Sequence, residues 1–518
     1  MRCMHADPEG RFVHQLILES CQRFASRTAI VDSSTGERVS YAEYGSRVEQ
    51  VAKGLVASGV RAGERVAIDL PNCWEFCVSY HATTLIGAVP TMLNPSYRER
   101  EVRYQVQNSG AATLITDAAV IKGVDLGGLP ELRRAFTTRN PMAGMQPFSN
   151  LLRPANVALP KPTQAPSAAL AALPYSSGTS GLPKGVMLTH HNLVSNIYQF
   201  LDCPTAPTLR PDDVVLCVVP LYHIYGLNVW LNPALAVGAT VVIMPRFEVS
   251  RFCEVMVREQ ATMLPLVPPI INTFCQEALK GTFPRQHSVR WVNSGGAPLA
   301  PELPRRFTDL TSIPVRQGFG MTEASPVTHQ GFLEPDLYQP DSIGRPVAAT
   351  ECMLLDGSGC QVKTGEPGEL VLRGPQFMLG YWNAPQETAA VLRDGCYWSG
   401  DLVRSDHRGF YYVVDRLRDM IKFKGFPIAP AEVESVLLEH PAVQDCGVTG
   451  RPDEEAGQVP HAYVVLRESY SPSDKLCRDL IGWVADQLTK FKQPHNVEFV
   501  QSIPRSPSGK ILRRNLGA

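Results

Sequence analysis

Residues 175–192 read YSSGTSGLPKGVMLTHHN, and this stretch indicates both the fold and the chemistry. Its Gly, Ser and Thr residues let several backbone N–H groups converge on one point, while hydroxyls add donors and Lys184 adds a charge. Such a nest is suited to an oligophosphate. The stretch differs from the GxxxxGK[ST] loop because Gly185 follows the lysine. A flexible linker is the alternative, but the lysine and the helix-like HHNLVSNIYQ that follows favour a phosphate site.

The length and composition predict a soluble protein of at least two domains. A chain of 518 residues exceeds a single hydrophobic core. Its 49 basic and 50 acidic side chains give a net charge of -1, which argues against a nucleic-acid partner. The 13 cysteines include no CxxC pair and indicate a reducing compartment. Cys73, Cys77 and His81 could share a helical face and hold a metal, but a buried helix is the favoured interpretation.

Neither a secretory signal nor a membrane span is predicted. Charged residues interrupt the first twenty positions, and the longest apolar region, 214–244, contains Pro220, His223 and Pro233. This region is expected to form buried strands and loops. We therefore expect a cytoplasmic protein without a membrane partner.

The order of the expected elements predicts an α/β fold. Segment 40–60 has apolar residues at helical spacing and leads into a short Val/Ile strand, and the alternation recurs, with a helix over about 73–86 and strands at 213–219 and 238–244. This predicts helix-covered, mostly parallel sheets. From about Ser342, closely spaced Gly and Pro predict a small β-barrel-like module. We expect a large domain over 1–415 and a small, mobile α+β domain over 416–518.

Three further segments carry residues suited to nucleotide chemistry. QGFGMTEAS (317–325) offers Phe319 as a flat face for a base, Thr322 as a donor and Glu323 as a hard oxygen ligand for magnesium. YWSGDLVRSD (397–406) places Asp401 after a glycine that should break the strand. PRSPSGKILRR (504–514) puts Lys510 in a Ser/Gly loop. Each residue alone also suits core, turn or surface.

In this order, these segments resemble the adenylate-forming (ANL) superfamily, from about Ala25 to Arg514. PLYHIYGLN (220–228), MPRFE (244–248), NSGGAPL (293–299) and DRLRDMIKFKGFPIAPAEVE (415–434) are most similar to the acyl-CoA synthetase branch around 4-coumarate-CoA ligase. The resemblance implies that a carboxylate attacks the α-phosphorus of Mg·ATP, that pyrophosphate leaves, and that the thiol of coenzyme A then displaces AMP. Positioned cations and N–H donors should dominate such catalysis.

The resemblance assigns the nucleotide-binding residues by position. Thr322 would contact the α-phosphate, Lys510 would bridge the α-phosphate and the acid, and Asp401 and Arg416 would bind the ribose. Magnesium would be held by Glu323 and Thr179. The phosphate loop would comprise Ser176, Ser177, Gly178, Thr179, Ser180, Gly181 and Lys184. The adenine site would comprise Gly296, Ala297, Gln317, Gly318, Phe319, Gly320 and Met321.

Further residues are assigned to the acid, to coenzyme A and to a hinge. His223 would gate the acid pocket, Arg418 would be the pivot of the small domain, and Lys422 would act in the second step. Arg246, Lys424 and Gly425 would lie along coenzyme A. The acid pocket would comprise Tyr222, Ile224, Tyr225, Trp230, Gly295, Gly318 and Val327. Because these are apolar and partly aromatic, an aryl, cinnamate-like or medium-chain acid is expected.

Two positions shape the alternatives. Ile224 stands where amino-acid-activating relatives carry an aspartate, so an α-amino acid is disfavoured. Pro427 replaces a polar residue that aryl-CoA ligases carry near AMP and the thiol. An enzyme that passes the acyl group to a carrier-protein thiol or an amine, or that activates an oxyanion such as nitrite, therefore stays open, as does a non-catalytic nucleotide-binding scaffold. A homodimer is also left open.

Overall fold

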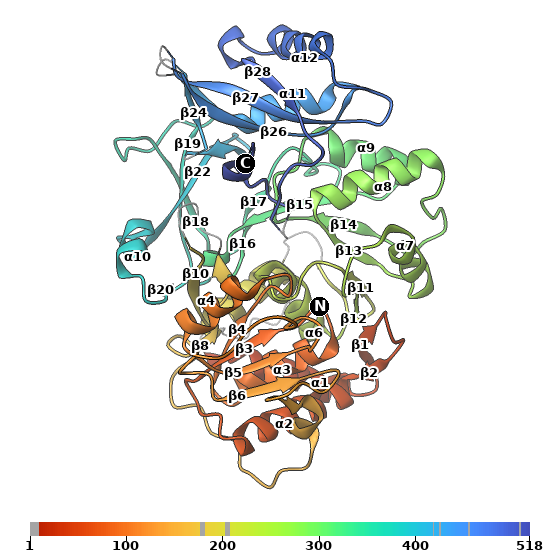
Figure 1. Cartoon of the computed structure of the whole chain (residues 1–518), viewed down its shortest axis with the longest axis vertical. Helices are drawn as coiled ribbons and strands as arrows, with labels where there is room; N and C mark the ends of the chain where they lie inside the picture. The colour runs from red at the N-terminus through yellow and green to blue at the C-terminus, as the bar shows by residue number, and fades with distance from the viewer. Residues whose placement is uncertain are drawn as a thin grey trace.

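The structure is a computed structural model that describes residues 10–176, 182–202, 208–417, 419–423, 426–453, 456–506 and 509–517. The expected fold class is confirmed, because helices and several sheets form a large N-terminal part with a smaller C-terminal part beside it (Figure 1). The N-terminal β3–β6 sheet and the C-terminal β24–β28 sheet lie at opposite ends of the molecule in this view.

The largest sheet has nine strands, of which the central six are parallel. Its edges are antiparallel additions at β2 on one side and at β16 and β17 on the other. In spatial order the strands are β17 (Arg345–Pro346), β16 (Val327–Gln330), β15 (Val315–Gly320), β14 (Trp291–Ser294), β13 (Met263–Leu266), β11 (Val214–Cys217), β12 (Thr240–Ile243), β1 (Thr28–Asp32) and β2 (Arg38–Ser40).

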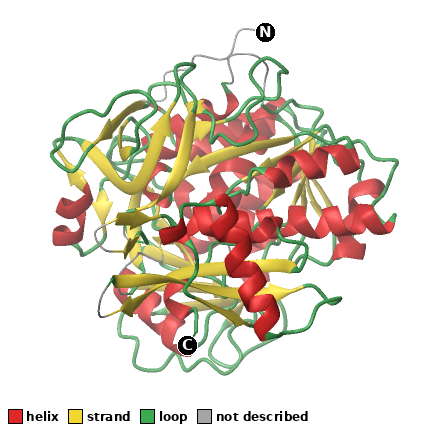
Figure 2. Cartoon of the chain, turned by 90° about the horizontal axis from the view of Figure 1, so that it is seen from above, coloured by secondary structure: helices red, strands yellow, loops and turns green. Residues whose placement is uncertain are grey.

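Both faces of the sheet centre are buried, which is why the central strands β11 and β12 are runs of apolar, mostly β-branched residues. Val241 and Ile243 belong to one core and Val242 to the other, as the alternation of a strand requires. Figure 2 shows helices flanking the strands. One face packs on α1 (Val13–Arg23), α2 (Tyr41–Ala57), α3 (Trp74–Leu85), α5 (His190–Leu201) and α6 (Asn232–Val237), and the other on α7 (Val249–Arg258), α8 (Pro268–Lys280) and α9 (Glu302–Thr311).

A second, parallel sheet shares the first of these cores. Its Val66 and Ile68 lie in the same cluster as Ile30 of the large sheet, and α2 and α3 contribute side chains to that cluster. Ser40 caps α2 and forms a capping box with Glu43, so the sequence specifies where this helix starts. The strand order is β4 (Val89–Met92), β3 (Arg65–Asp69), β5 (Ala111–Thr116), β6 (Arg134–Thr137) and β7 (Gln146–Pro147), and α4 spans Glu99–Ser109.

The Gly/Pro-rich region after Ser342 is antiparallel β structure, as expected. Its strands are β18 (Glu351–Leu355), β19 (Gly368–Arg373), β21 (Leu392–Arg393), β22 (Cys396–Ser405) and β23 (Tyr411–Arg416), with α10 at Pro385–Val391. A smaller sheet joins β10 (Lys184–Thr189) to β8 (Leu170–Ala172), β9 (Tyr175–Ser176) and β20 (Gly380–Tyr381). This smaller sheet brings the 175–192 stretch beside residues two hundred positions later.

The C-terminal part has its own sheet and its own core. Val433, Leu437, Val448, Val464 and Leu480 are buried together in that core. Its elements are β24 (Ile421–Phe423), β25 (Phe426–Ile428), α11 (Pro430–Glu439), β26 (Val443–Asp453), β27 (Gly457–Leu466), α12 (Asp474–Gln487) and β28 (Asn496–Phe499). The boundary between 415 and 416 stays a prediction.

The structure bears on two expectations about apolar segments, and it corrects the first of them. The interval between β11 and β12 is not strands and loops, because it holds a π-helical turn (Gly226–Leu231) followed by α6. Pro233 is tolerated because it stands in the first turn of α6, where no N–H is needed. Within the described ranges, no helix is long and apolar enough to cross a membrane.

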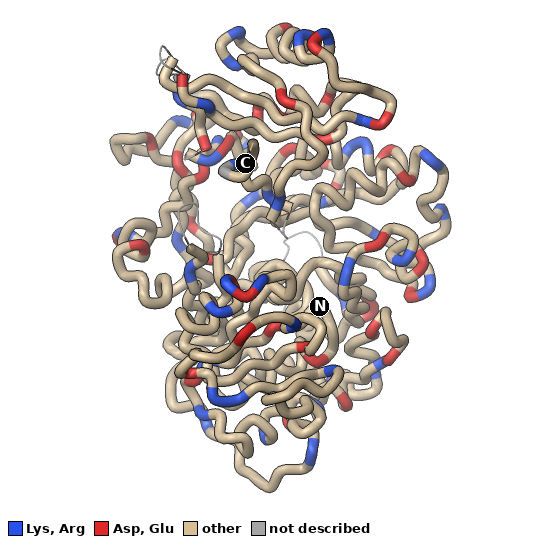
Figure 3. Tube along the Cα trace, viewed as in Figure 1, with Lys and Arg blue, Asp and Glu red and all other residues tan. Residues whose placement is uncertain are grey.

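The Cys73–Cys77–His81 face is core rather than a metal site. Both ring nitrogens of His81 are engaged, Nδ1 with the hydroxyl of Tyr44 at 2.7 Å and Nε2 with the amide of Asn232 at 3.1 Å. Among the described residues no group of three His, Cys, Asp or Glu side chains could hold a metal ion. The positions of basic and acidic residues are interspersed along the chain in Figure 3, in line with the balanced composition.

Candidate active site

A cavity of about 870 Å³ lies where the large sheet, the antiparallel β region and the C-terminal segment meet. Of the expected residues, it is lined at one end by Ser176, Lys184, Thr322, Glu323, Asp401, Arg416 and Lys510. Elsewhere it is lined by Tyr222, His223, Ile224, Tyr225, Gly295, Gly296, Gly318, Phe319, Gly320, Met321 and Val327. Segments hundreds of residues apart therefore converge on one space, as the motifs predicted.

The two ends of the glycine-rich stretch are joined by strand pairing. Ser176 of β9 pairs with Lys184 of β10, and both residues line the cavity. The hydroxyl of Ser176 is buried and has no hydrogen-bond partner among the described residues. A buried hydroxyl of this kind is suited to form a hydrogen bond with a ligand in the cavity. The expected loop residues Ser177, Gly178, Thr179, Ser180 and Gly181 lie outside the described residues.

Tyr381, which the motif analysis missed, connects Lys184 with Glu323. The ammonium of Lys184 lies 5.3 Å from the centre of the Tyr381 ring, and the Tyr381 hydroxyl donates a 2.8 Å hydrogen bond to Glu323 Oε1. β20 pairs with β10, with Tyr381 opposite Val186, and this places the tyrosine beside the motif. Tyr397 also lines the cavity, and its pKa is raised mainly by burial and further by Glu323. The only sequence signal for Tyr381 was its place in LGYW, 379–382.

Gly320 holds the turn that presents Thr322 and Glu323. A Cβ at Gly320 would lie 1.9 Å from the carbonyl oxygen of Pro326, so only glycine permits this close approach. Thr322 and Glu323 follow in a short 3₁₀ turn, Thr322–Ala324, and the backbone carbonyl of Glu323 accepts from Met378 at 2.8 Å. The turn therefore directs a threonine hydroxyl and a carboxylate towards the same cavity.

Asp401 is presented by a bulge, and the expectation that Gly400 breaks the strand is wrong. β22 continues through Gly400, whose φ is +69°, a conformation that favours glycine. The register against β19 shifts here, and the N–H of Gly400 bonds to the Glu369 side chain at 3.2 Å instead. Such bulges bend a strand and re-aim its side chains. Asp401 consequently lines the cavity although it is almost fully buried.

Asp401, Arg416 and Lys510 form a buried charge cluster. Arg416 Nε lies 3.0 Å from Asp401 Oδ1. Burial raises the pKa of Asp401, and Arg416 and Lys510 oppose that rise. Burial also lowers the pKa of Lys510 to about 8, with Arg416 lowering it further and Asp401 raising it. Lys510 therefore remains predominantly protonated at neutral pH.

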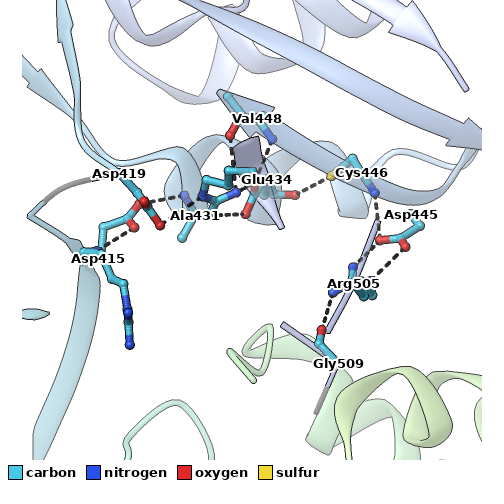
Figure 4. Close-up of polar contacts among 11 residues, drawn as sticks. Asp415, Asp419, Ala431, Glu434, Asp445, Cys446, Val448, Arg505 and Gly509 are labelled. Carbon is cyan, nitrogen blue, oxygen red and sulfur yellow. Dashed lines mark hydrogen bonds and ion pairs between the residues drawn. The ribbon is translucent and has the colours of Figure 1, made fainter. Parts of the chain in front are cut away.

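The loop that carries Lys510 is anchored to the C-terminal sheet. The guanidinium of Arg505 forms two contacts with Asp445 of β26, at 2.6 and 3.3 Å, and donates to the carbonyl of Gly509 at 2.8 Å (Figure 4). Ser506 and Lys510 bond to each other through Ser506 N–H to the Lys510 carbonyl and Lys510 N–H to Ser506 Oγ. The ion pair between Arg505 and Asp445, together with the bond from Arg505 to Gly509, thus positions the segment that carries Lys510.

The junction itself is also hydrogen-bonded. Asp415 accepts from the N–H of Ala431, in the first turn of α11, at 2.9 Å and from the N–H of Arg416 at 2.6 Å (Figure 4). Burial raises the pKa of Asp415 to about 6. A carboxylate at a helix N-terminus satisfies a donor that the helix leaves open. Asp415 therefore links β23 to the C-terminal part.

The part of the cavity expected to bind the acid has apolar and aromatic walls around His223. His223 is held by a 3.2 Å bond from the N–H of Tyr225 to its Nδ1, and burial lowers the pKa of His223 to about 4, so its imidazole is neutral at physiological pH. A Cβ at Gly295 would lie 2.9 Å from the ring of Tyr225, which explains the glycine there. Ile224 and Val327 complete the apolar wall.

Several expected residues lie elsewhere. Trp230, expected in the acid pocket, is fully buried behind it, with its ring against Phe200 and Tyr225 at 5.5 and 6.3 Å. The reason is the π-helical turn, which directs Trp230 into the core. Ala297 and Gln317 are near the cavity in sequence but are not among its described lining residues, and the amide oxygen of Gln317 is buried without a described partner.

The two described residues expected to act with coenzyme A, Arg246 and Lys422, are not among the lining residues of this cavity. Arg246 is exposed and lines a separate depression of about 420 Å³. Lys422 is exposed on β24, where it pairs with Pro427 across the hairpin to β25. Lys424, Gly425 and the expected pivot Arg418 lie outside the described residues.

Comparison with known proteins defines the class. The model of the AMP-binding enzyme family matches residues 17–382, and that of the AMP-binding enzyme C-terminal domain matches residues 432–510. The chain belongs to the AMP-binding enzyme family. It is 36% identical to 4-coumarate--CoA ligase 1 of Solanum tuberosum and to 4-coumarate--CoA ligase 5 of Oryza sativa subsp. japonica, with 99% of this chain and 94% and 95% of those proteins covered.

Solved structures with the same fold include two aryl-acid ligases. An anthranilate CoA ligase in complex with anthranoyl-AMP superposes with a TM-score of 0.88 at 27% identity, covering 98% of this chain and 97% of that one. A benzoate CoA ligase from Burkholderia xenovorans LB400 superposes with a TM-score of 0.87 at 26% identity, covering 98% and 100%. The resemblance to the acyl-CoA synthetase branch is thereby confirmed.

Proposed function

We propose that the protein is an AMP-forming acid–CoA ligase. The observation that carries this proposal is the convergence of Lys184, Glu323, Asp401, Arg416 and Lys510 on one cavity that is also lined by apolar and aromatic side chains. The relatives named 4-coumarate--CoA ligase and the neighbouring benzoate and anthranilate CoA ligases support it. They favour this reaction over transfer to a carrier protein or an amine, activation of nitrite, or a non-catalytic scaffold.

In the first step, a carboxylate oxygen attacks the α-phosphorus of ATP and pyrophosphate leaves. Lys184 and the Ser176 loop are suited to the β- and γ-phosphates, and Asp401 and Arg416 to the ribose hydroxyls. Lys510 lies beside Asp401 and Arg416 and supplies a cation where the α-phosphate and the carboxylate meet. Cations placed before the reaction stabilise the charge that develops on the phosphate oxygens without reorganisation.

The described residues fit a magnesium ion that is shared with the nucleotide. Mg²⁺ is commonly held by one or two carboxylates together with substrate phosphates, and Glu323 offers a carboxylate oriented by Tyr381 at the cavity wall. Thr179, the second expected ligand, lies outside the described residues. When bound, magnesium would neutralise phosphate charge.

In the second step, the thiol of coenzyme A displaces AMP. Lys422 lies outside the cavity in this arrangement, so its predicted role requires the C-terminal domain to rotate about Arg418 between the two steps, whereas Arg246 belongs to the large domain and would meet coenzyme A outside the cavity. Pivots are commonly terminal residues of elements that absorb a large φ/ψ change. Rotation would also withdraw Lys510, which the first step alone requires. An aryl, cinnamate-like or medium-chain acid is the proposed substrate class, and a cytoplasmic location stays a prediction.

The test is pyrophosphate release across aryl and fatty acids, with and without coenzyme A. We expect acid-dependent release in both conditions and an acyl-CoA thioester only when coenzyme A is present. Acid-dependent release with no thioester would instead point to another acceptor, and the absence of release with every acid would indicate the scaffold. Either result would overturn the ligase assignment.

A further inference from the structure

A buried arginine lies behind the part of the cavity wall that is formed by Phe200, Asn293 and Gln330, although the motif analysis expected only apolar residues in the acid pocket. Arg316 of β15 is 4% exposed. Its guanidinium lies 4.0 Å from the centre of the Trp291 ring and 5.7 Å from that of Phe200, and Phe200 lines the cavity. Cation–π contacts of this kind hold a guanidinium in one orientation.

Strand geometry places Arg316 in line with the cavity floor. Side chains two apart on a strand share a face, so Arg316, Gly318 and Gly320 point the same way, and the two glycines leave the space that the cavity occupies. Arg316 is paired with Asn293 of β14, and Gly318 with Gln330 of β16. Asn293 and Gln330 both line the cavity. Amide side chains therefore flank the glycine floor, with Gln330 opposite Gly318 and Asn293 opposite Arg316, about 7 Å along the strand from Gly318.

The arginine determines which polar atoms these amides present. A guanidinium has donors only, so neighbouring amides must turn their oxygens towards it. Arg316 Nε donates to the amide oxygen of Asn293 at 3.3 Å. The orientation of Gln330 that pairs donors with acceptors lets its amide oxygen accept from Arg316 at 2.6 Å and from Thr208 at 3.1 Å. Because this oxygen is engaged, the NH₂ group is the part of the Gln330 amide that can donate to a ligand in the cavity.

Asn293 has the same arrangement, but one of its two amide N–H donors is already used. Its NH₂ group bonds to the hydroxyl of Tyr225 at 3.2 Å, and Tyr225 in turn donates to the backbone carbonyl of Asn293 at 3.2 Å. Of the two amides, Gln330 thus has the less engaged NH₂ group and is the stronger candidate donor to a ligand, and the buried charge of Arg316 behind it makes the local potential positive. Both effects favour electron-rich atoms at the end of the bound acid.

From this geometry we propose that the enzyme selects acids that carry a hydrogen-bond acceptor at the end opposite the reacting carboxylate, such as a para ether, nitro, carbonyl or carboxylate group. This proposal rests on the proposed function, since it concerns the acid that the enzyme adenylates. An alkyl group at that position would leave the Gln330 donor buried without a partner, and such a loss is costly. The substrate class is therefore narrower than apolar aryl acids.

The test compares acids matched in shape in the pyrophosphate-release assay. 4-Methoxycinnamate and 4-ethylcinnamate differ by an acceptor oxygen in place of a methylene, and 4-nitrocinnamate and 4-isopropylcinnamate form a second pair. We expect the acceptor member of each pair to have a kcat/KM at least about tenfold higher. Equal values, or a preference for the alkyl members, would overturn the proposal while leaving the ligase assignment intact. No release with any acid would refute the ligase assignment itself.

A variant identifies the source of the preference. Gln330→Met keeps the length of the side chain but removes the donor, and it should reduce the ratio within each pair to about one. Gln199 is a second buried glutamine, bonded to the carbonyl of Ala348 at 2.7 Å, and Gln199→Met should retain the wild-type ratio. Because a ratio is measured within one protein, a general loss of activity does not mimic the result. A ratio that persists in Gln330→Met would contradict the assignment.

Discussion

Replacement of Lys510 by alanine should impair the first half-reaction alone. The ammonium belongs to the charge cluster with Asp401 and Arg416 at the nucleotide end of the cavity. An ion contact at about 4 Å with an effective dielectric near 20 is worth roughly 4 kcal/mol. If about half of that is realised only in the transition state, adenylation slows about thirtyfold. Displacement of AMP by a thiol does not use this cation, so thiolysis should be nearly unaffected.

The assay follows the two steps separately. Single-turnover pyrophosphate release measures adenylation, and thioester formation from a supplied acyl-AMP measures thiolysis. Lys475→Ala is the matched control, because Lys475 is exposed on α12 and outside the cavity. It should leave both rates at the wild-type level. Equal loss in both half-reactions of Lys510→Ala would refute the reasoning, since it would mean that the lysine supports the fold or a shared step.

The remaining predictions concern the same cavity. Because the pKa of Lys510 is lowered to about 8, kcat/KM for adenylation should fall as pH rises through about 8. Lys510→Arg stays protonated and should move that fall to higher pH. An unchanged pH profile in the variant would show that deprotonation of Lys510 does not cause the fall. Gly318→Val should fold, since a Cβ there meets nothing closer than 3.7 Å, but it should lower kcat/KM for long aryl acids by about tenfold or more. Gly320→Ala should lower the melting temperature, because its Cβ would lie 1.9 Å from a carbonyl oxygen. A larger loss of melting temperature in Gly318→Val than in Gly320→Ala would contradict this packing. Arg505→Met removes the anchor to Asp445 and should slow adenylation about tenfold while thiolysis is spared, and wild-type single-turnover kinetics would show that the anchor is dispensable.

Local motifs predicted residues that the structure brings to one cavity, because these motifs carry their own geometry. The glycine-rich stretch, the turn before Glu323 and the Asp401 segment each have the backbone freedom and functional groups that they need within a few residues. Hydrophobic periodicity likewise predicted α2, α3 and the buried strands, since their faces repeat at the helical or strand period. These elements lie where the residue pattern placed them.

The residues that were missed depend on topology. Tyr381 reaches Glu323 only because β20 pairs with β10, and the Arg316–Asn293–Gln330 set exists only because β14, β15 and β16 are neighbours in this register. No local pattern contains such long-range pairing. Trp230 was expected in the acid pocket but lies in the core behind it. The π-helical turn shifts the helical phase by one residue and directs this side chain away from the cavity.

The most direct test of acid adenylation is the fate of a carboxylate oxygen. The acid is prepared with its carboxylate enriched in the heavy isotope of oxygen and is incubated with ATP, magnesium and coenzyme A, and the nucleotide product is then analysed by mass spectrometry. The mechanism requires the bond between that oxygen and the α-phosphorus to survive thiolysis, so AMP should carry one heavy oxygen. Formation of ADP, or of AMP without the heavy isotope, would contradict the proposed function.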